Sequence, residues 1–244
     1  MDKKIYVLIP ARSGSKSLPN KNIKLYNGKP LLVHSIEVAQ KSKYINPENI
    51  YVSTDSEEYA MIAAEYGAKV PFLRPITFAG DLSTDLEVFH HMNMGLFNMG
   101  IDLPDIWIHL RPTYPNRSVE LLDRVIEIFL SEMDRYTSLR TVVPIDLTPY
   151  KMYHIDEENN EYKPIFLNYN GYKEPYNQCR QIFPQTYVHN GCIDIIKNSV
   201  IDGVYDMGSM TGDRIYPYIM DNEELDDIDT EKDFKRSENK VSKN

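Results

Sequence analysis

Residues 7–22 read Val7-Leu-Ile-Pro-Ala-Arg-Ser-Gly-Ser-Lys-Ser-Leu-Pro-Asn-Lys-Asn22, an apolar run that changes abruptly into small residues and cations. The short apolar segment over residues 5–9 predicts a buried strand. Pro10, Gly14 and Pro19 then interrupt any regular helix or strand. The stretch therefore predicts a loop that is held by the end of a strand.

This loop carries three cations within ten residues, Arg12, Lys16 and Lys21, in a chain whose formal net charge is −9. Clustered cations attract a triphosphate, and the small residues 13–15 let backbone N–H groups approach one. The patterns G-x-x-x-x-G-K-[ST] and G-x-G-x-x-G are absent, so this is neither a Walker loop nor a dinucleotide fingerprint. On charge alone, a nucleoside triphosphate loop and a solvated basic loop both stay open.

The segments after the loop alternate between helical and strand patterns. Helices are predicted over residues 30–43, 55–66, 84–99 and 118–132 and from Thr230, and strands over 50–54, 69–73, 105–110, 141–145 and 216–220. Asp55-x-x-Glu58 and Thr84-x-x-Glu87 each predict a capping box. This order predicts an α/β fold with three layers, in which helices cover both faces of a mainly parallel sheet.

Charged residues follow several of the predicted strands directly. Arg12, Asp55, Arg74 and Arg111 each stand just past a strand end. Ligands of open α/β sheets bind beyond the carboxyl ends of the strands. We therefore expect these four side chains to share one crevice.

Composition limits the classes of partner. With 244 residues, 42% of them apolar, the chain can form one main domain over 1–244. The net charge of −9 argues against binding nucleic acid or an anionic membrane. Two cysteines, Cys179 and Cys192, are too few for a disulfide framework, and no apolar run reaches the roughly 18 residues of a membrane span. A cytoplasmic protein is expected, with neither nucleic acid nor membrane as its partner.

Residues 147–206 differ in character from the rest of the chain, since Tyr, Asn and Pro are abundant and helical periodicity is weak. This composition predicts hairpins and loops that form a lid or a dimer arm.

The acidic stretch Asp226-Asp-Ile-Asp-Thr-Glu-Lys-Asp233 contains a second candidate site. Asp227 and Asp229 are two residues apart, so their side chains project on the same side of an extended segment. Two carboxylates on one side suit Mg²⁺, which bridges triphosphate oxygens and neutralises their charge. The alternative is an acidic helix N-terminus before Thr230.

The first loop resembles the signature of a known family. Ile9-Pro-Ala-Arg-Ser-Gly-Ser-Lys-Ser-Leu-Pro-Asn-Lys-Asn-Ile23, followed by Gly28-Lys-Pro-Leu31, is similar to the acylneuraminate cytidylyltransferases, which make CMP-activated sialic and related nonulosonic acids. Further matches follow in the family's order: Val52-Ser-Thr-Asp-Ser56, Val70-Pro-Phe-Leu-Arg-Pro75, Arg180-Gln-Ile-Phe-Pro-Gln185, Asn190-Gly191 and the Asp-Ile-Asp-Thr-Glu segment. The resemblance covers most of the chain and implies a Rossmann-like nucleotide-diphospho-sugar transferase sheet and a homodimer.

The resemblance also implies a role for each matched residue. The CTP-binding residues would be Ala11, Arg12, Ser13, Gly14, Ser15, Lys16, Lys21, Asn22, Arg74 and Ser83. The catalytic residues would be Arg12, Lys16, Lys21 and Asp229, and the Mg²⁺ ligands Asp227 and Asp229. A small acidic acceptor would be bound by Arg111, Lys151, Arg180 and Gln185, and an Arg matches a carboxylate with two parallel hydrogen bonds.

Three departures from the family pattern concern the acceptor side. Arg111-Pro-Thr-Tyr-Pro-Asn-Arg117 stands where the family usually reads Gln-Pro-Thr-Ser-Pro-Leu-Arg. Arg111 would thus place an extra positive charge against the acceptor, which suits a more anionic or differently decorated substrate than N-acetylneuraminate. Asp85 replaces a small hydroxyl residue near the cytosine loop, and Leu167-Asn-Tyr-Asn170 lacks an Arg. We expect an altered acceptor pocket beside an unchanged nucleotide site.

The expected function is Mg²⁺-dependent transfer of CMP from CTP to an acidic 2-ulosonic acid, with release of pyrophosphate. The catalytic effect would be positioning and electrostatic stabilisation without a covalent enzyme intermediate. Asp227, Asp229 and metal-bound water all remain open as the general base. Two alternatives stay open: transfer of a cytidylyl or guanylyl group to a phosphorylated or phosphonate acid, and a nucleotide- or carbohydrate-binding protein without turnover.

Overall fold

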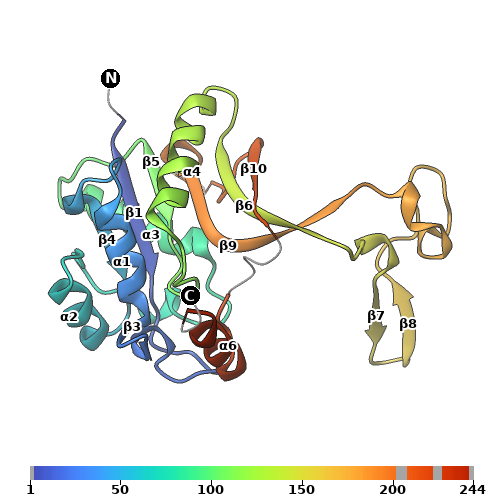
Figure 1. Cartoon of the computed structure of the whole chain (residues 1–244), viewed down its shortest axis with the longest axis horizontal. Coiled ribbons are helices and arrows are strands. Elements are labelled where there is room, and N and C mark those ends of the chain that lie inside the picture. The colour runs from blue at the N-terminus through green and yellow to red at the C-terminus, as the bar shows by residue number, and fades with distance from the viewer. Residues whose placement is uncertain (1–2, 202–207, 222–226, 242–244) are drawn as a thin grey trace. The chain divides into compact units, whose positions relative to one another are not determined.

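The computed structural model describes residues 3–201, 208–221 and 227–241. The chain divides into two compact units (Figure 1). The large unit comprises Met1–Thr141, Asn190–Tyr218 and Asp226–Asn244, and the small unit comprises Val142–His189 and Ile219–Leu225.

A six-stranded sheet organises the fold. Its strands are β1 (Ile5–Pro10), β4 (Ile50–Ser53), β5 (Ile106–His109), β6 (Ser138–Ile145), β9 (Thr186–Lys197) and β10 (Ile215–Ile219), in the order β10-β6-β9-β5-β1-β4. Strand β1 pairs in parallel with both β4 and β5, whereas β5 pairs antiparallel with β9. The predicted α/β class with a mainly parallel sheet is confirmed.

Helices cover the two faces of this sheet. They are α1 (Leu31–Lys41), α2 (Glu57–Glu65), α3 (Asp85–Asn98), α4 (Val119–Glu132), the short α5 (Asn198–Ile201) and α6 (Glu231–Val241). Tyr6 and Leu8 of β1 pack with α3 in one buried cluster. The alternate residues Val7 and Ile9 are also fully buried and point to the opposite face, because side chains alternate along a strand. Helix α1 contacts both β1 and α4, which accounts for the burial of that second face.

Capping explains where two of the helices begin. Thr84 and Glu87 form the predicted capping box at the start of α3. The predicted box of Asp55 and Glu58 is wrong, because Ser56 is the N-cap of α2 and its side chain accepts from the backbone N–H of Tyr59. Asp55 instead accepts hydrogen bonds from Ser13 of the first loop.

Two predicted strands need correction. Residues 69–73 form a single bridge between Lys69 and Tyr51, and Pro71 ends the pairing because it has no N–H to donate. The segment over residues 141–145 does not complete the sheet, since β9 and β10 also belong to it. Strand β9 was missed because its sequence, Thr186 to Lys197, is mixed in polarity until residue 191.

The small unit contains hairpins, as its composition predicts. Strands β7 (Tyr153–Asp156) and β8 (Glu161–Pro164) pair antiparallel, and an aromatic cluster of Tyr150, Phe166, Tyr169 and Phe183 packs beside short 3-10 turns. This unit differs from the predicted arm of 147–206 at its end, because Asn190–Tyr218 belong to the large unit. Among the described residues, no helix is both long and apolar enough to cross a membrane.

A buried polar network ties α3 to the sheet. The Nε1–H of Trp107 donates to Oδ1 of both Asn93 and Asn198 at 3.0 Å, and Nδ2 of Asn93 donates to the same Asn198 oxygen at 2.8 Å. Asn93→Ala is expected to lower the free energy of unfolding by about 1–3 kcal/mol, because a buried donor loses one of its partners. Urea denaturation measures this loss. Asn98→Ala, at the exposed end of the same helix, is the control and should change stability little.

Candidate active site

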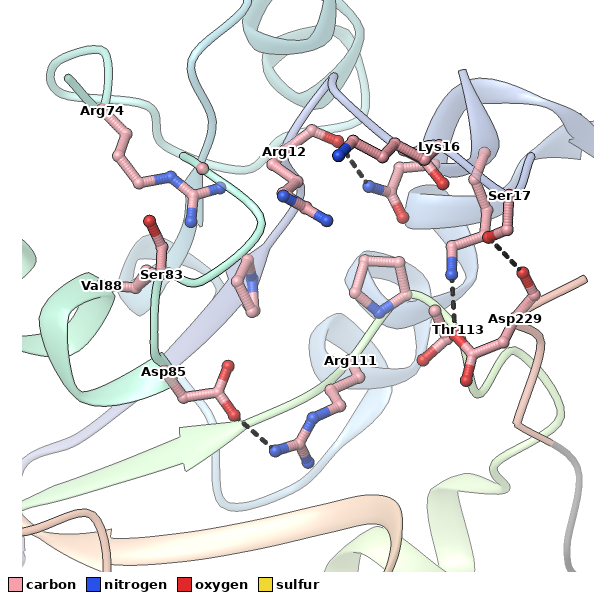
Figure 2. A pocket seen from close by; sticks show the side chains of 16 residues that line it. Arg12, Lys16, Ser17, Arg74, Ser83, Asp85, Val88, Arg111, Thr113 and Asp229 are labelled. Carbon is pink, nitrogen blue, oxygen red and sulfur yellow. Dashed lines mark hydrogen bonds and ion pairs between the residues drawn. The ribbon is translucent and has the colours of Figure 1, made fainter. Parts of the chain in front are cut away.

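A cavity of about 380 Å³ lies in the large unit (Figure 2). It is lined by Pro10, Arg12, Ser15, Lys16, Ser17, Lys21, Asn22, Arg74, Gly80, Ser83, Asp85, Val88, Arg111, Pro112, Thr113 and Asp229. These residues come from the loop after β1, the segment around the start of α3, the end of β5, and the segment before α6. The cavity thus brings together most of the residues that the sequence assigned to CTP and catalysis, along with Arg111 from the acceptor set.

The segment before α6 is bound directly to the first loop. The side chain of Lys21 is only 11% exposed, and its ammonium donates to Asp229 Oδ1 and to the carbonyl of Ile228, both at 3.0 Å. The hydroxyl of Ser17 donates to the carbonyl of Asp229 at 2.7 Å. Residues more than two hundred positions apart therefore form one wall of the cavity.

A carboxylate that the sequence analysis did not single out binds the other two loop cations. Arg12 Nη1 donates to Asp81 Oδ1 at 3.0 Å, and the ammonium of Lys16 contacts the second oxygen of the same residue. The hydrogen bonds from Lys16 and Arg12 hold the pKa of Asp81 below its usual value. Asp81 thus occupies a position between two cations that an anionic ligand could take. Its place in an irregular Gly80-Asp81 loop gave no sequence signal for this contact.

Asp55 shapes the first loop through both of its carboxylate oxygens. Oδ1 accepts from the backbone N–H of Ser13 and Oδ2 from the Ser13 hydroxyl, each at 2.8 Å. The buried Asn22 adds a second tie, because its Nδ2 donates to the carbonyl of Arg12 at 2.9 Å. The loop conformation that presents Arg12 and Lys16 to the cavity therefore depends on side chains outside the cation cluster.

Asp55→Asn is expected to weaken binding of CTP, the ligand that the sequence resemblance implies, about tenfold, because an amide nitrogen cannot accept one of the two hydrogen bonds from Ser13. Isothermal titration calorimetry measures this change without any need for turnover. Ser56→Ala is the matched control, since Ser56 only caps α2. Wild-type affinity in Asp55→Asn would contradict a role for Asp55 in positioning the loop.

Arg74 is nearly buried, with 5% of its surface exposed, yet it lines the cavity. Its guanidinium donates to the carbonyl of Ser53 at 3.2 Å and more weakly to that of Phe78 at 3.4 Å. Burial lowers the pKa of Arg74, and its Nε has no hydrogen-bond partner among the described residues. The residue is thus fixed by backbone carbonyls while part of its hydrogen-bonding capacity is unused.

The expectation that Arg111 offers an extra positive charge is wrong. Its Nη1 donates to Asp194 at 2.9 Å and its Nη2 to Asp85 at 2.6 Å. Burial opposes a charged guanidinium here, but the charges of Asp194 and Asp85 raise the pKa of Arg111 above its usual value. The guanidinium of Arg111 therefore stays protonated, and two carboxylates compensate its charge.

Asp227 fits a divalent cation. Its Oδ1 is buried and has no hydrogen-bond partner in the described part of the chain. Burial raises the pKa of Asp227, and the nearby charge of Asp229 adds to this effect although a hydrogen bond with Thr113 opposes it. The described residues contain no group of three or more acidic, His or Cys side chains that could hold a metal ion. A cation bound by this pair would therefore need further oxygens from a ligand, as Mg²⁺ commonly does with phosphates.

The small unit has its own pocket, of about 270 Å³, which includes two of the predicted acceptor residues. Arg180 donates to Asp146 at 2.8 Å, and Gln185 lies on the same pocket wall. Lys151 ends a 3-10 turn and is not among the residues that line this pocket. Arg111 belongs to the large unit, so the acceptor roles of these four residues stay predictions.

Comparison with protein families gives one match that covers more than half of the chain. The family model described as "Cytidylyltransferase" matches residues 6–151. The chain is also similar to the "Post-translational flagellin modification protein B" of Campylobacter coli, with 31% identity over 231 residues that cover 95% of this chain and 92% of that protein.

Other curated relatives match in part. The "CMP-N,N'-diacetyllegionaminic acid synthase" of Legionella pneumophila is 37% identical over 161 residues, which cover 66% of this chain and 67% of that protein. An "N-acylneuraminate cytidylyltransferase" of Escherichia coli is 31% identical over 235 residues, which cover 96% of this chain. The match spans 51% of that enzyme, so this chain corresponds to about half of its length.

A solved structure shares the fold. The "CMP:2-keto-3-deoxy-manno-octonic acid synthetase" determined in complex with CTP superposes with a TM-score of 0.70, and the match covers 98% of this chain and 99% of that one. The sequence identity is 15%, so this likeness concerns the fold alone.

Proposed function

Because the chain belongs to the cytidylyltransferase family, we propose that it transfers CMP from CTP to an acidic 2-ulosonic acid and releases pyrophosphate. Relatives named for N,N'-diacetyllegionaminic acid and N-acylneuraminate support this class of acceptor. The altered residues on the acceptor side argue for a decorated nonulosonic acid rather than N-acetylneuraminate itself.

The observation that carries the proposal is the meeting of Lys21 and Asp229 at 3.0 Å in a cavity that Arg12 and Lys16 also line. A triphosphate with a divalent cation needs cations for its oxygens and carboxylates for its metal. The cavity supplies both. A loop that only displayed basic residues to solvent would not bury the Lys21 ammonium against a carboxylate from the other end of the chain.

The reaction forms a bond between an acceptor oxygen and the α-phosphorus and breaks the bond between that phosphorus and the pyrophosphate oxygen. Arg12, Lys16 and Lys21 would donate to phosphate oxygens as their charge grows. Asp227 and Asp229 would hold Mg²⁺, which supplies charge neutralisation on the phosphates when it is bound. The proton of the acceptor hydroxyl would pass to one of these two aspartates or to water.

The test is pyrophosphate release by the chain with CTP or GTP, with and without Mg²⁺. The acceptors are N-acetylneuraminic, N,N'-diacetyllegionaminic and pseudaminic acids and a phosphorylated sugar acid. We expect release with CTP, Mg²⁺ and a 2-ulosonic acid. Preference for GTP or for the phosphorylated acid would favour the alternative transferase. CTP binding without release from any acceptor would favour a binding protein.

We further propose that the chain acts as a homodimer through the small unit. Its support is the number of large apolar side chains that this unit exposes, including Ile155, Tyr162, Leu167 and Val188. Light scattering at micromolar concentration tests the dimer, and a monomer would contradict it. The cytoplasmic location stays a prediction.

A further inference from the structure

Two of the departures from the family pattern, Arg111 and Asp85, are in contact on the cavity wall (Figure 2). Both residues line the cavity, and Arg111 Nη2 donates to Asp85 Oδ2 at 2.6 Å. Asp85 is the first residue of α3, directly after the Thr84 capping box that fixes the backbone at this point. The carboxylate is therefore presented from a well-anchored position.

The charges around this pair cancel. Asp194 is buried and lies near two guanidiniums, since it accepts from Arg111 at 2.9 Å and one of its oxygens is 3.6 Å from Arg140 Nε. His109 also lies beside Asp194, but complete burial lowers the pKa of His109 and thus disfavours its charged form. Two arginines thus face two aspartates, and the cluster has no net charge to offer a ligand.

Arg111 also lies beside Gly191 of β9, where a Cβ would be in ordinary contact with Arg111 Cδ at 3.5 Å. The guanidinium itself is held by a carboxylate at each side. An anionic ligand could not easily pull Arg111 away from its two partners, because Asp194 would be left buried with less compensation.

The pair lines the same cavity as residues proposed for the two halves of the reaction. Arg74 lies on this lining with Asp85, and Asp229 lies on it with Arg111. Arg74 belongs to the side expected to bind the base, and Asp229 to the side expected to bind the metal. An acceptor that attacks the α-phosphorus must lie beside this second side.

On the basis of the proposed function, we infer that Asp85 is a specificity-determining residue that, together with Arg111, binds an uncharged polar group of the acceptor, such as a hydroxyl or an N-acyl amide. The Asp85 side chain is 38% exposed, so its carboxylate can accept from a ligand while it also accepts from Arg111. The guanidinium of Arg111 has further N–H groups to donate. A carboxylate at this position would instead meet Asp85 without a free cation, and would be disfavoured.

The experiment compares wild-type protein with Asp85→Asn in steady-state pyrophosphate release. One acceptor is N,N'-diacetyllegionaminic acid. The others are two analogues of it, each with a succinyl group in place of one of the two acetyl groups, which adds a carboxylate at that position. Asp102→Asn is the matched control, because Asp102 is an exposed aspartate paired with Lys4 outside the cavity.

Asp85→Asn is expected to raise the KM of the diacetyl acceptor at least about tenfold while the KM of CTP stays within about twofold, because a charge-assisted hydrogen bond to the acceptor is lost. The preference in kcat/KM for the diacetyl over the succinyl acceptor should fall by at least a similar factor for one of the two analogues. Arg111→Lys, which keeps the charge, should add little to the effect of Asp85→Asn if the two residues act as a unit.

Unchanged acceptor KM and unchanged preference in Asp85→Asn would overturn the inference. A rise in the KM of CTP alone would also overturn it, since the pair would then bind the nucleotide. In both of these outcomes the wild-type protein still releases pyrophosphate, which distinguishes them from a failure of the proposed function. That failure would be the absence of turnover by the wild-type protein with every acceptor, and both proposals would then be rejected.

Discussion

Lys21→Ala is expected to reduce pyrophosphate release by about a thousandfold and to leave the chain folded. The side chain of Lys21 is the most buried of the three loop cations, and its ammonium also binds Asp229 in the cavity. Its loss removes a donor to the phosphates and releases the aspartate. Initial rates at saturating CTP and acceptor measure the effect on kcat, and thermal unfolding shows whether the fold is intact.

Lys24→Ala is the matched control for this experiment. Lys24 also connects the first loop to α6, through Glu231 at 3.5 Å and the ring of Phe234 at 5.3 Å, but it does not line the cavity. We expect this variant to keep near-wild-type turnover. Equal activity in Lys21→Ala and Lys24→Ala would contradict the phosphate-binding role of the loop and the proposed transferase activity.

Asp229→Asn is expected to lower kcat by at least about a hundredfold and to raise the Mg²⁺ concentration needed for half-maximal rate. The substitution takes away one of the two carboxylates proposed as metal ligands and weakens the contact with Lys21. Rates measured across a Mg²⁺ titration separate loss of metal affinity from a general loss of activity. Asp227→Asn should raise the Mg²⁺ concentration needed for half-maximal rate in the same way.

Glu231→Gln provides the control for the charge of this segment. Glu231 is two residues further on, is partly exposed and pairs with Lys24 and Lys235 at the start of α6. Neutralising it should change the Mg²⁺ dependence little. A wild-type Mg²⁺ half-saturation in both Asp227→Asn and Asp229→Asn would exclude this pair as the metal site.

Local patterns predicted the regular elements of the large unit well. Residues 5–9, 84–99 and 118–132 were expected as a strand and two helices, and β1, α3 and α4 lie within a residue or two of these bounds. These elements carry their signals within a few residues, as an apolar period and a capping residue. The strand predicted over residues 69–73 is only a bridge at Lys69, and the long strand β9 was missed, because pairing with distant strands decides both.

The side-chain partners at the site were much less predictable. Asp55 was expected to cap α2 and instead binds Ser13, 42 positions away. Asp81 gave no signal at all, and Arg111 was expected to act as an uncompensated cation. Each error concerns a choice between a local partner and a distant one, and spacing along the chain holds no information about distant partners.

The amino-acid sequence by itself determined that a strand would end in a cationic loop, that the fold would be α/β, and that two aspartates two residues apart would be available near the C-terminus. Tertiary structure alone decided that Lys21 meets Asp229, that Asp81 binds Arg12 and Lys16, and that Asp85 and Asp194 compensate Arg111. The physical reason is how far apart along the chain the interacting residues are. Strand and helix formation depends on neighbours within a few residues, whereas an ion pair forms only where packing brings two distant segments within about 4 Å.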